Sequence, residues 1–195
     1  MFMCTTISVQ AQDMKTLWQS MPAQLTPYLS ETNRRDLVDG GDSRVVVENQ
    51  LGEKTQLDTI TANYMQIQLN KAVTWQLKTL QSADGKTVVC SVKTYRAPEA
   101  ESSVTLYDSE WNVIGHVEVK KFADTLLQSP DTLSRGKYDE LISTVPFVTV
   151  EATLSLSDNT LSLTPHTPMT SNENQEALKN CVLLKTLKWD GYTFK

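Results

Sequence analysis

The chain contains two histidines, so any catalysis by an imidazole side chain would have to use one of them. His116 follows Gly115 beside a predicted strand, and His166 lies in a predicted loop between Pro165 and Pro168. A serine or cysteine nucleophile needs a nearby base and a recognisable turn, such as G-x-S-x-G. Neither histidine has such a signature close to it. We therefore interpret both as ordinary satisfied or surface residues and expect no catalytic residue.

Two short patterns resemble motifs of catalysis or phosphate binding but lack the rest of the motif. Gly85-Lys86-Thr87 matches the end of a phosphate-binding loop, yet Leu80 stands where that loop needs its first glycine. Ser134 and Lys137 match S-x-x-K, but the companion S-D-N and K-T-G motifs of serine acyl-enzymes are missing. A hairpin tip and a helix start explain these residues better.

The acidic residues do not form a recognisable metal site. Asp36, Asp39 and Asp42 recur every three residues around Gly40-Gly41, whereas a calcium loop places its carboxylates at alternate positions. The sequence also lacks C-x-x-C and H-E-x-x-H. We expect neither a metal ion nor a cofactor, and interpret the three aspartates as a solvated helix end.

Aromatic side chains concentrate on the predicted strands and give the chain its best candidates for binding. Core packing accounts for most of them, but an exposed subset could bind a peptide or a glycan, because exposed apolar patches often mark interaction sites. The candidate binding residues are Trp75, Tyr107, Trp111 and Trp189.

Composition excludes some functions and leaves others open. The net charge is −5, and lysine and arginine are scattered, which argues against a nucleic-acid partner. No apolar run reaches the roughly 20 residues that a transmembrane helix needs. Residues 1–11 end in Val9-Gln10-Ala11, which suits signal-peptidase cleavage, so we expect a truncated signal peptide and a periplasmic, secreted or cell-envelope location. The alternative is a cytosolic protein with a frayed N-terminus.

Two of the three cysteines follow that leader. Cys90 and Cys181 both lie among apolar neighbours in predicted strands. Two buried thiols are the simpler interpretation, since free cysteine is among the most buried residue types. A disulfide between the two halves of the chain is the alternative in an exported protein.

The elements that must position these residues form an approximate internal repeat. Residues 75–115 and 148–194 each read as strand, tight tip, strand, proline-containing loop and further strand. Asp84-Gly85 supplies the positive φ angles of a hairpin turn in the first block. Residues 64–69 alternate apolar and polar side chains, which predicts another strand. Helices are expected over 13–20, 22–29 and 122–127, and from Asp131 or Ser134 to Val145. A further helical turn is expected from Thr32 or Asn33 to Val38, and at most one within 165–180.

These patterns predict an α+β fold of two tandem helix-plus-antiparallel-sheet units, with a layout that resembles β-lactamase-inhibitor-type proteins. The expected units are residues 12–118 and 119–195. The layout is an analogy of fold and carries no function with it.

The chain resembles an uncharacterised family of proteins exported by Gram-negative gut anaerobes. The resemblance covers nearly the whole chain after Ala11, and it implies export without implying an activity or any functional residue. It rests on Met21-Pro-x-x-Leu-x-Pro-Tyr-Leu29, Arg34-Arg-Asp-Leu-Val-Asp39, Asn49-x-Leu-Gly52, Leu57-x-x-Ile-Thr-x-x-Tyr64, Asp84-Gly85, Ser103-x-x-x-Tyr-Asp-x-x-Trp111 and Trp189-Asp-Gly-x-x-Phe194.

The function that fits these observations best is a non-enzymatic exported binding module, whose partner would be an envelope protein, a peptide or a glycan. One alternative is a hydrolase acting on peptide or glycan that uses His116 or the carboxylates of Asp108 and Glu110. The other is a structural component of an envelope assembly.

Overall fold

A computed structural model describes residues 13–40 and 44–195. The predicted signal peptide of residues 1–11, and Asp42, lie outside the described residues. Seven antiparallel strands follow one another in chain order in a large sheet. They are β1 (Val46–Glu48), β2 (Lys54–Ile60), β3 (Tyr64–Asn70), β4 (Val73–Gln81), β5 (Thr87–Arg96), β6 (Ala100–Asp108) and β7 (Val113–Val117).

A smaller sheet of three strands follows, in the order β10-β9-β8. Its strands are β8 (Thr149–Leu154), β9 (Thr160–His166) and β10 (Lys185–Lys188). The helical elements are α1 (Met14–Ser20), η1 (Ala23–Leu25), α2 (Glu31–Asp39), η2 (Val119–Thr125), α3 (Arg135–Ser143) and α4 (Asn172–Lys179). Among the described helices, none combines the length and the apolar character needed to cross a bilayer.

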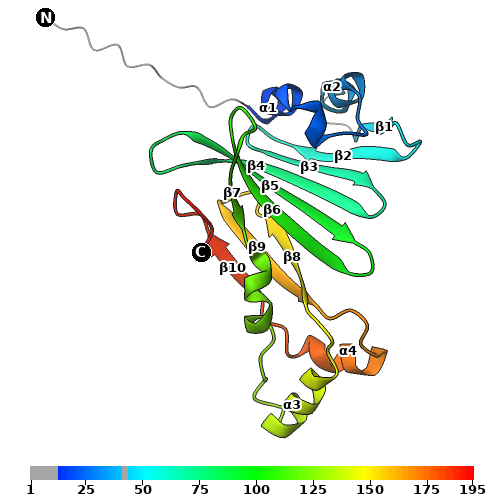
Figure 1. Cartoon of the computed structure of the whole chain (residues 1–195), viewed down its shortest axis with the longest axis vertical. Helices are drawn as coiled ribbons and strands as arrows, with labels where there is room; N and C mark the ends of the chain where they lie inside the picture. The colour runs from blue at the N-terminus through cyan, green and yellow to red at the C-terminus, as the bar shows by residue number, and fades with distance from the viewer. Residues whose placement is uncertain (1–12, 41–43) are drawn as a thin grey trace, which may run out of the picture.

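The two faces of the large sheet are covered by different layers (Figure 1). On one face, α1 and α2 pack through Leu17, Trp18 and Leu37 against strand residues such as Trp75. On the other face, the small sheet packs across β4, β5 and β6, so that Cys90 lies in a cluster with residues of both sheets. The period-two alternation of the strands produces this arrangement, because successive side chains point to opposite faces.

The small sheet turns the outer edge of β8 toward polar side chains of the large sheet. The backbone N–H of Ala152 donates to Ser102 Oγ at 2.9 Å, and that of Leu154 donates to Gln76 Oε1 at 2.9 Å. Lys78 Nζ donates to the carbonyl oxygen of Ser155 at 2.7 Å. Buried backbone groups need partners, and an edge strand has no neighbouring strand to supply them. Side chains therefore take the place of a fourth strand.

The structure confirms the α+β class and most of the expected elements, including the strand at β3, the β4–β5 hairpin and the helix at α1. The expected helix over 22–29 is wrong, because a 3₁₀ turn over Ala23–Leu25 ends before Pro27. The expectation for residues 165–180 is also wrong. Helix α4 spans eight residues there, and its N-cap Ser171 accepts a hydrogen bond from Asn174 N.

The sheets differ in strand number, seven against three, and one hydrophobic cluster draws on both. The large sheet ends at Val117 and the small sheet begins at Thr149. The division into tandem units 12–118 and 119–195 stays a prediction. Cys90 and Cys181 are both buried free thiols, so the alternative disulfide is not formed. Burial raises the pKa of the Cys90 thiol well above its usual range.

Candidate functional site, an apolar groove beside Lys93

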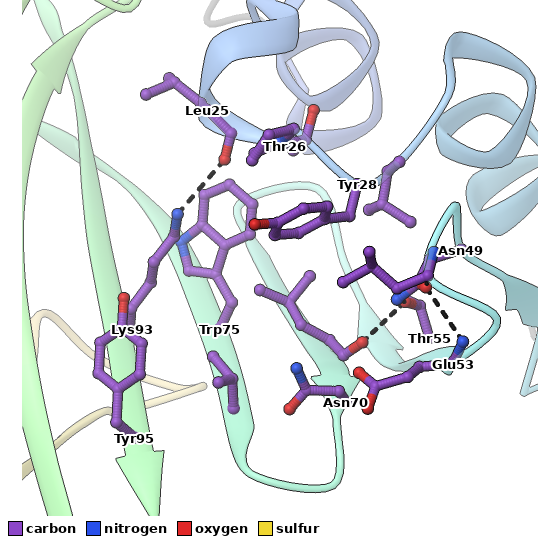
Figure 2. A pocket seen from close by; sticks show the side chains of 15 residues that line it. Leu25, Thr26, Tyr28, Asn49, Glu53, Thr55, Asn70, Trp75, Lys93 and Tyr95 are labelled. Carbon is purple, nitrogen blue, oxygen red and sulfur yellow. Dashed lines mark hydrogen bonds between the residues drawn. The ribbon is translucent and has the colours of Figure 1, made fainter.

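A groove with a volume of about 240 Å³ lies where the α1–α2 connection crosses the ends of β2 to β5. Figure 2 shows its residues, which come from the connection, from the β1–β2 turn and from the strand ends. Three large side chains on it are exposed to solvent: Tyr28 by 53%, Leu51 by 60% and Tyr95 by 49%. Its apolar walls include Leu25, Leu29, Leu51, Leu69, Val73 and Trp75.

The β1–β2 turn and the α1–α2 connection are fixed to each other by the backbone. Asn49 Oδ1 accepts hydrogen bonds from Leu51 N at 2.9 Å and from Glu53 N at 3.1 Å, which shapes the turn. Gly52 has a φ of 76°, a conformation that glycine adopts without strain. Gln50 N then donates to the carbonyl oxygen of Tyr28 at 2.9 Å. The β1–β2 turn and the α1–α2 connection, which bound the groove on two sides, are therefore held together by a backbone hydrogen bond.

Lys93 brings a positive charge to this apolar groove. Its Nζ donates to the carbonyl oxygen of Leu25 at 3.3 Å and lies 4.1 Å from the ring centroid of Trp75 (Figure 2). Burial lowers the pKa of Lys93. An ammonium over an indole face gains from the ring quadrupole, which partly offsets the loss of water. The groove thus combines apolar walls with one half-buried cation.

A second group of ionisable side chains joins the two sheets. Arg96 Nη2 lies 2.7 Å from Glu151 Oε1, and His166 Nε2 lies 3.1 Å from Glu151 Oε2. The other ring nitrogen of His166 lies 3.6 Å from Glu99 Oε2. The hydrogen bond with His166 is the main cause that lowers the pKa of Glu151, followed by Arg96. This network connects β5 and its following loop with β8 and β9.

The network predicts a pH-dependent contribution to stability. Folding lowers the pKa of Glu151 below its usual value of 4.5, so the ionised form stabilises the fold above that pH. This contribution is lost as the pH falls from 4.5 through the lowered pKa. Glu151→Gln should therefore cost about 2 kcal/mol at pH 7 and less at pH 3. Urea unfolding at both pH values measures the difference.

The matched control is Glu176→Gln, which removes an exposed carboxylate that pairs with Lys179 at the surface. Its effect should stay within about 0.5 kcal/mol at both pH values. A Glu151→Gln effect of the same size at pH 7 and pH 3 would contradict the assignment.

The four predicted binding residues lie at three separate places. Trp75 is buried and forms part of the groove wall, where its Nε1 donates to Ser91 Oγ at 2.8 Å. Tyr107 and Trp111 pack together with ring centroids 5.6 Å apart, and Trp111 is buried. Trp189 packs on Phe194 with ring centroids 5.3 Å apart, and its Nε1 donates to the carbonyl oxygen of Gln81 at the β4–β5 hairpin. A binding role for all four residues stays a prediction.

The residues considered for hydrolysis have local structural partners. His116 lies on β7 with its Nδ1 3.3 Å from Thr105 Oγ1. Asp108 accepts hydrogen bonds from the backbone N–H groups of Glu110 and Asn112, which holds the β6–β7 turn. Of the three aspartates considered for calcium, Asp39 pairs with Lys15 at 2.8 Å. Within residues 13–40 and 44–195, no group of three or more His, Cys, Asp or Glu side chains could hold a metal.

Sequence reasoning missed Tyr28, Leu51 and Lys93, which give the groove its exposed walls and its charge. Two of the segments that carry the family resemblance, Met21–Leu29 and Asn49–Gly52, meet at this groove. Their meeting depends on the contact between Gln50 and Tyr28, which no local pattern indicates. The signal that could have indicated Lys93 is a lysine on the helix-facing side of a strand that is otherwise buried.

Comparisons with known proteins give a family and a fold. A family model described as "Protein of unknown function (DUF3256)" matches residues 6–194. Among solved structures, the chain is similar to a domain of an uncharacterized protein from Porphyromonas gingivalis W83. The two share 20% identity with a TM-score of 0.73, over 95% of this chain and 99% of the other. None of the curated proteins matches.

Proposed function

We propose that this chain, which belongs to the DUF3256 family of proteins of unknown function, is a non-enzymatic module that binds a segment of a partner polypeptide in its groove. The observation that carries the proposal is the exposure of Tyr28, Leu51 and Tyr95 around one apolar groove. Large apolar side chains held together at the surface often mark interaction sites. Recognition of a polypeptide needs such an anchor pocket and does not need a catalytic group.

The size of the groove supports a polypeptide segment over a large organic ligand. Pockets for drug-sized ligands usually enclose about 300–1,000 Å³. A volume of about 240 Å³ is smaller than that range and suits one or two apolar side chains. The fixed contact between the β1–β2 turn and the α1–α2 connection favours a preformed pocket, which lowers the ordering cost of binding.

We also propose that the protein acts outside the cytoplasm, in the periplasm or at the cell envelope. The pattern of residues 1–11 supports this location, because small residues precede the expected cleavage after Ala11. Fractionation of cells expressing the natural gene, combined with mass analysis of the mature N-terminus, tests the location. Recovery of the intact chain from the cytoplasm alone would contradict it.

Selection from a display library of random twelve-residue peptides tests the binding function. Peptides enriched on the immobilised protein should bind wild type in solution and bind Tyr28→Ala about thirtyfold more weakly. This factor corresponds to about 2 kcal/mol for a residue at the centre of an interface. Isothermal titration calorimetry measures both affinities.

The control is Tyr192→Ala, which removes an exposed tyrosine that does not line the groove. Selected peptides should bind this variant as they bind wild type. Equal affinity for wild type and Tyr28→Ala, or a failure to enrich any peptide, would contradict the proposed function.

A further inference from the structure

The charge of Lys93 has no acidic partner within the described part of the chain. Its Nζ contacts the Leu25 carbonyl oxygen and the Trp75 ring, and neither carries a full negative charge. An ammonium has three N–H donors, so these contacts leave donor capacity unused. A half-buried charge without a counter-charge lowers stability unless a ligand supplies one. The groove is therefore electrostatically incomplete in its free form.

We propose that the groove binds the carboxyl-terminal end of its partner, with the last apolar side chain against the walls and the terminal carboxylate paired with Lys93. This inference rests on the proposed function and specifies which part of the partner enters. A terminal residue carries its side chain and its carboxylate on one Cα atom. Both can therefore enter a small volume together, which suits the roughly 240 Å³ of the groove.

The second charged side chain of the groove orients such a ligand. Figure 2 shows Glu53 at the side of the groove away from Lys93. Its carboxylate disfavours an anion at that end and can accept hydrogen bonds from the backbone N–H groups of an entering peptide. The carboxylate of the ligand is thus directed to Lys93, and the rest of its chain leaves past Leu51 and Glu53.

The walls define the chemistry of the last residue. Leu29, Leu69 and Val73 are aliphatic, and Tyr28 and Tyr95 add aromatic surface at the opening. Burial of apolar area stabilises by about 25 cal/mol per Å², so leucine or phenylalanine at the end gains more than alanine or serine. We expect leucine and phenylalanine to be preferred at the last position.

Matched peptide pairs test the inference. The probes are N-acetylated hexapeptides, Ac-Gly-Ser-Gly-Ser-Gly-X, with X as Leu, Phe or Ser, each made as free acid and as amide. Fluorescence anisotropy of labelled versions should show the Leu and Phe acids binding at least tenfold more tightly than their amides. A tenfold change corresponds to 1.4 kcal/mol, an ordinary value for a charge-assisted pair.

Lys93→Met keeps the apolar stem and removes the charge, so it should abolish the preference for acid over amide. Lys71→Met, at an exposed lysine outside this groove, should keep that preference. Thermal melting of both variants checks that each one folds.

Three results would overturn the inference. Equal binding of acids and amides, with both lost in Tyr28→Ala, refutes the carboxylate pair and leaves the proposed function standing. If amidated peptides that carry an internal aspartate bind as tightly as the free acids, the groove does not require the carboxyl-terminal end of its partner. Absence of binding by every hexapeptide also refutes it, and the library selection described above then decides the proposed function separately.

Discussion

Replacing Trp18 with alanine is expected to lower the free energy of unfolding by about 3–5 kcal/mol, the usual cost of truncating a buried tryptophan. Trp18 is completely buried between α1 and the large sheet, where it packs edge-on against Trp75 with ring centroids 5.7 Å apart. Its Nε1 also donates to the carbonyl oxygen of Arg34 in α2 at 2.8 Å. Alanine would leave a cavity and remove this hydrogen bond between α1 and α2.

Urea unfolding followed by far-ultraviolet circular dichroism measures this loss. Trp18→Phe fills much of the cavity but cannot donate to Arg34, so its cost should be intermediate. Tyr192→Ala is the matched control, because Tyr192 is 75% exposed and its removal should change stability by no more than about 0.5 kcal/mol. A loss below 1 kcal/mol for Trp18→Ala would contradict the packing of α1 on the sheet.

Replacing Lys78 with alanine is expected to cost about 2–4 kcal/mol. Lys78 is 1% exposed, and its Nζ donates to the carbonyl oxygens of Ser155 at 2.7 Å and Leu156 at 3.3 Å. Burial lowers the pKa of this ammonium, yet its hydrogen bonds connect β4 to the end of β8. Alanine removes the charge-assisted hydrogen bonds together with the buried stem.

Lys78→Met separates the two contributions, since it keeps most of the stem and loses only the hydrogen bonds. It should cost about 1–2 kcal/mol less than alanine. Lys71→Ala, at an exposed lysine in the β3–β4 turn, should leave stability unchanged within about 0.5 kcal/mol. Equal unfolding curves for Lys78→Ala and Lys71→Ala would show that Lys78 does not join the sheets.

Local signals predicted the strands and hairpins of the fold well. Strict alternation over residues 64–69 indicates β3, and Asp84-Gly85 indicates the β4–β5 tip, where Gly85 has a φ of 80°. Such features depend on neighbours within a few residues. Helix α4 was missed because its composition is polar and its stability depends on the Ser171 cap, a weaker signal than an apolar stripe.

The candidate site was predicted much less well. The residue type of Trp75 makes it a candidate for binding; it lies in the groove wall, and its binding role stays a prediction. Tyr28 and Lys93 were not named, because they are 65 residues apart in the chain and nothing local in either segment refers to the other. Likewise, Pro165 and Pro168 indicate a loop at His166, whereas His166 lies at the end of β9 between Glu99 and Glu151.

The sequence by itself determined the α+β class, most strands and their turns, and the absence of a recognisable catalytic motif, since these depend on side-chain period and local backbone preference. Only the tertiary structure decided that a three-stranded sheet crosses a seven-stranded one and that Ser102, Gln76 and Lys78 support its edge. It also decided that Lys93 lies in an apolar groove, where no acidic side chain of residues 13–40 and 44–195 pairs with it. These features arise from contacts between segments distant in sequence, whose energies depend on burial and on partners that local patterns do not encode.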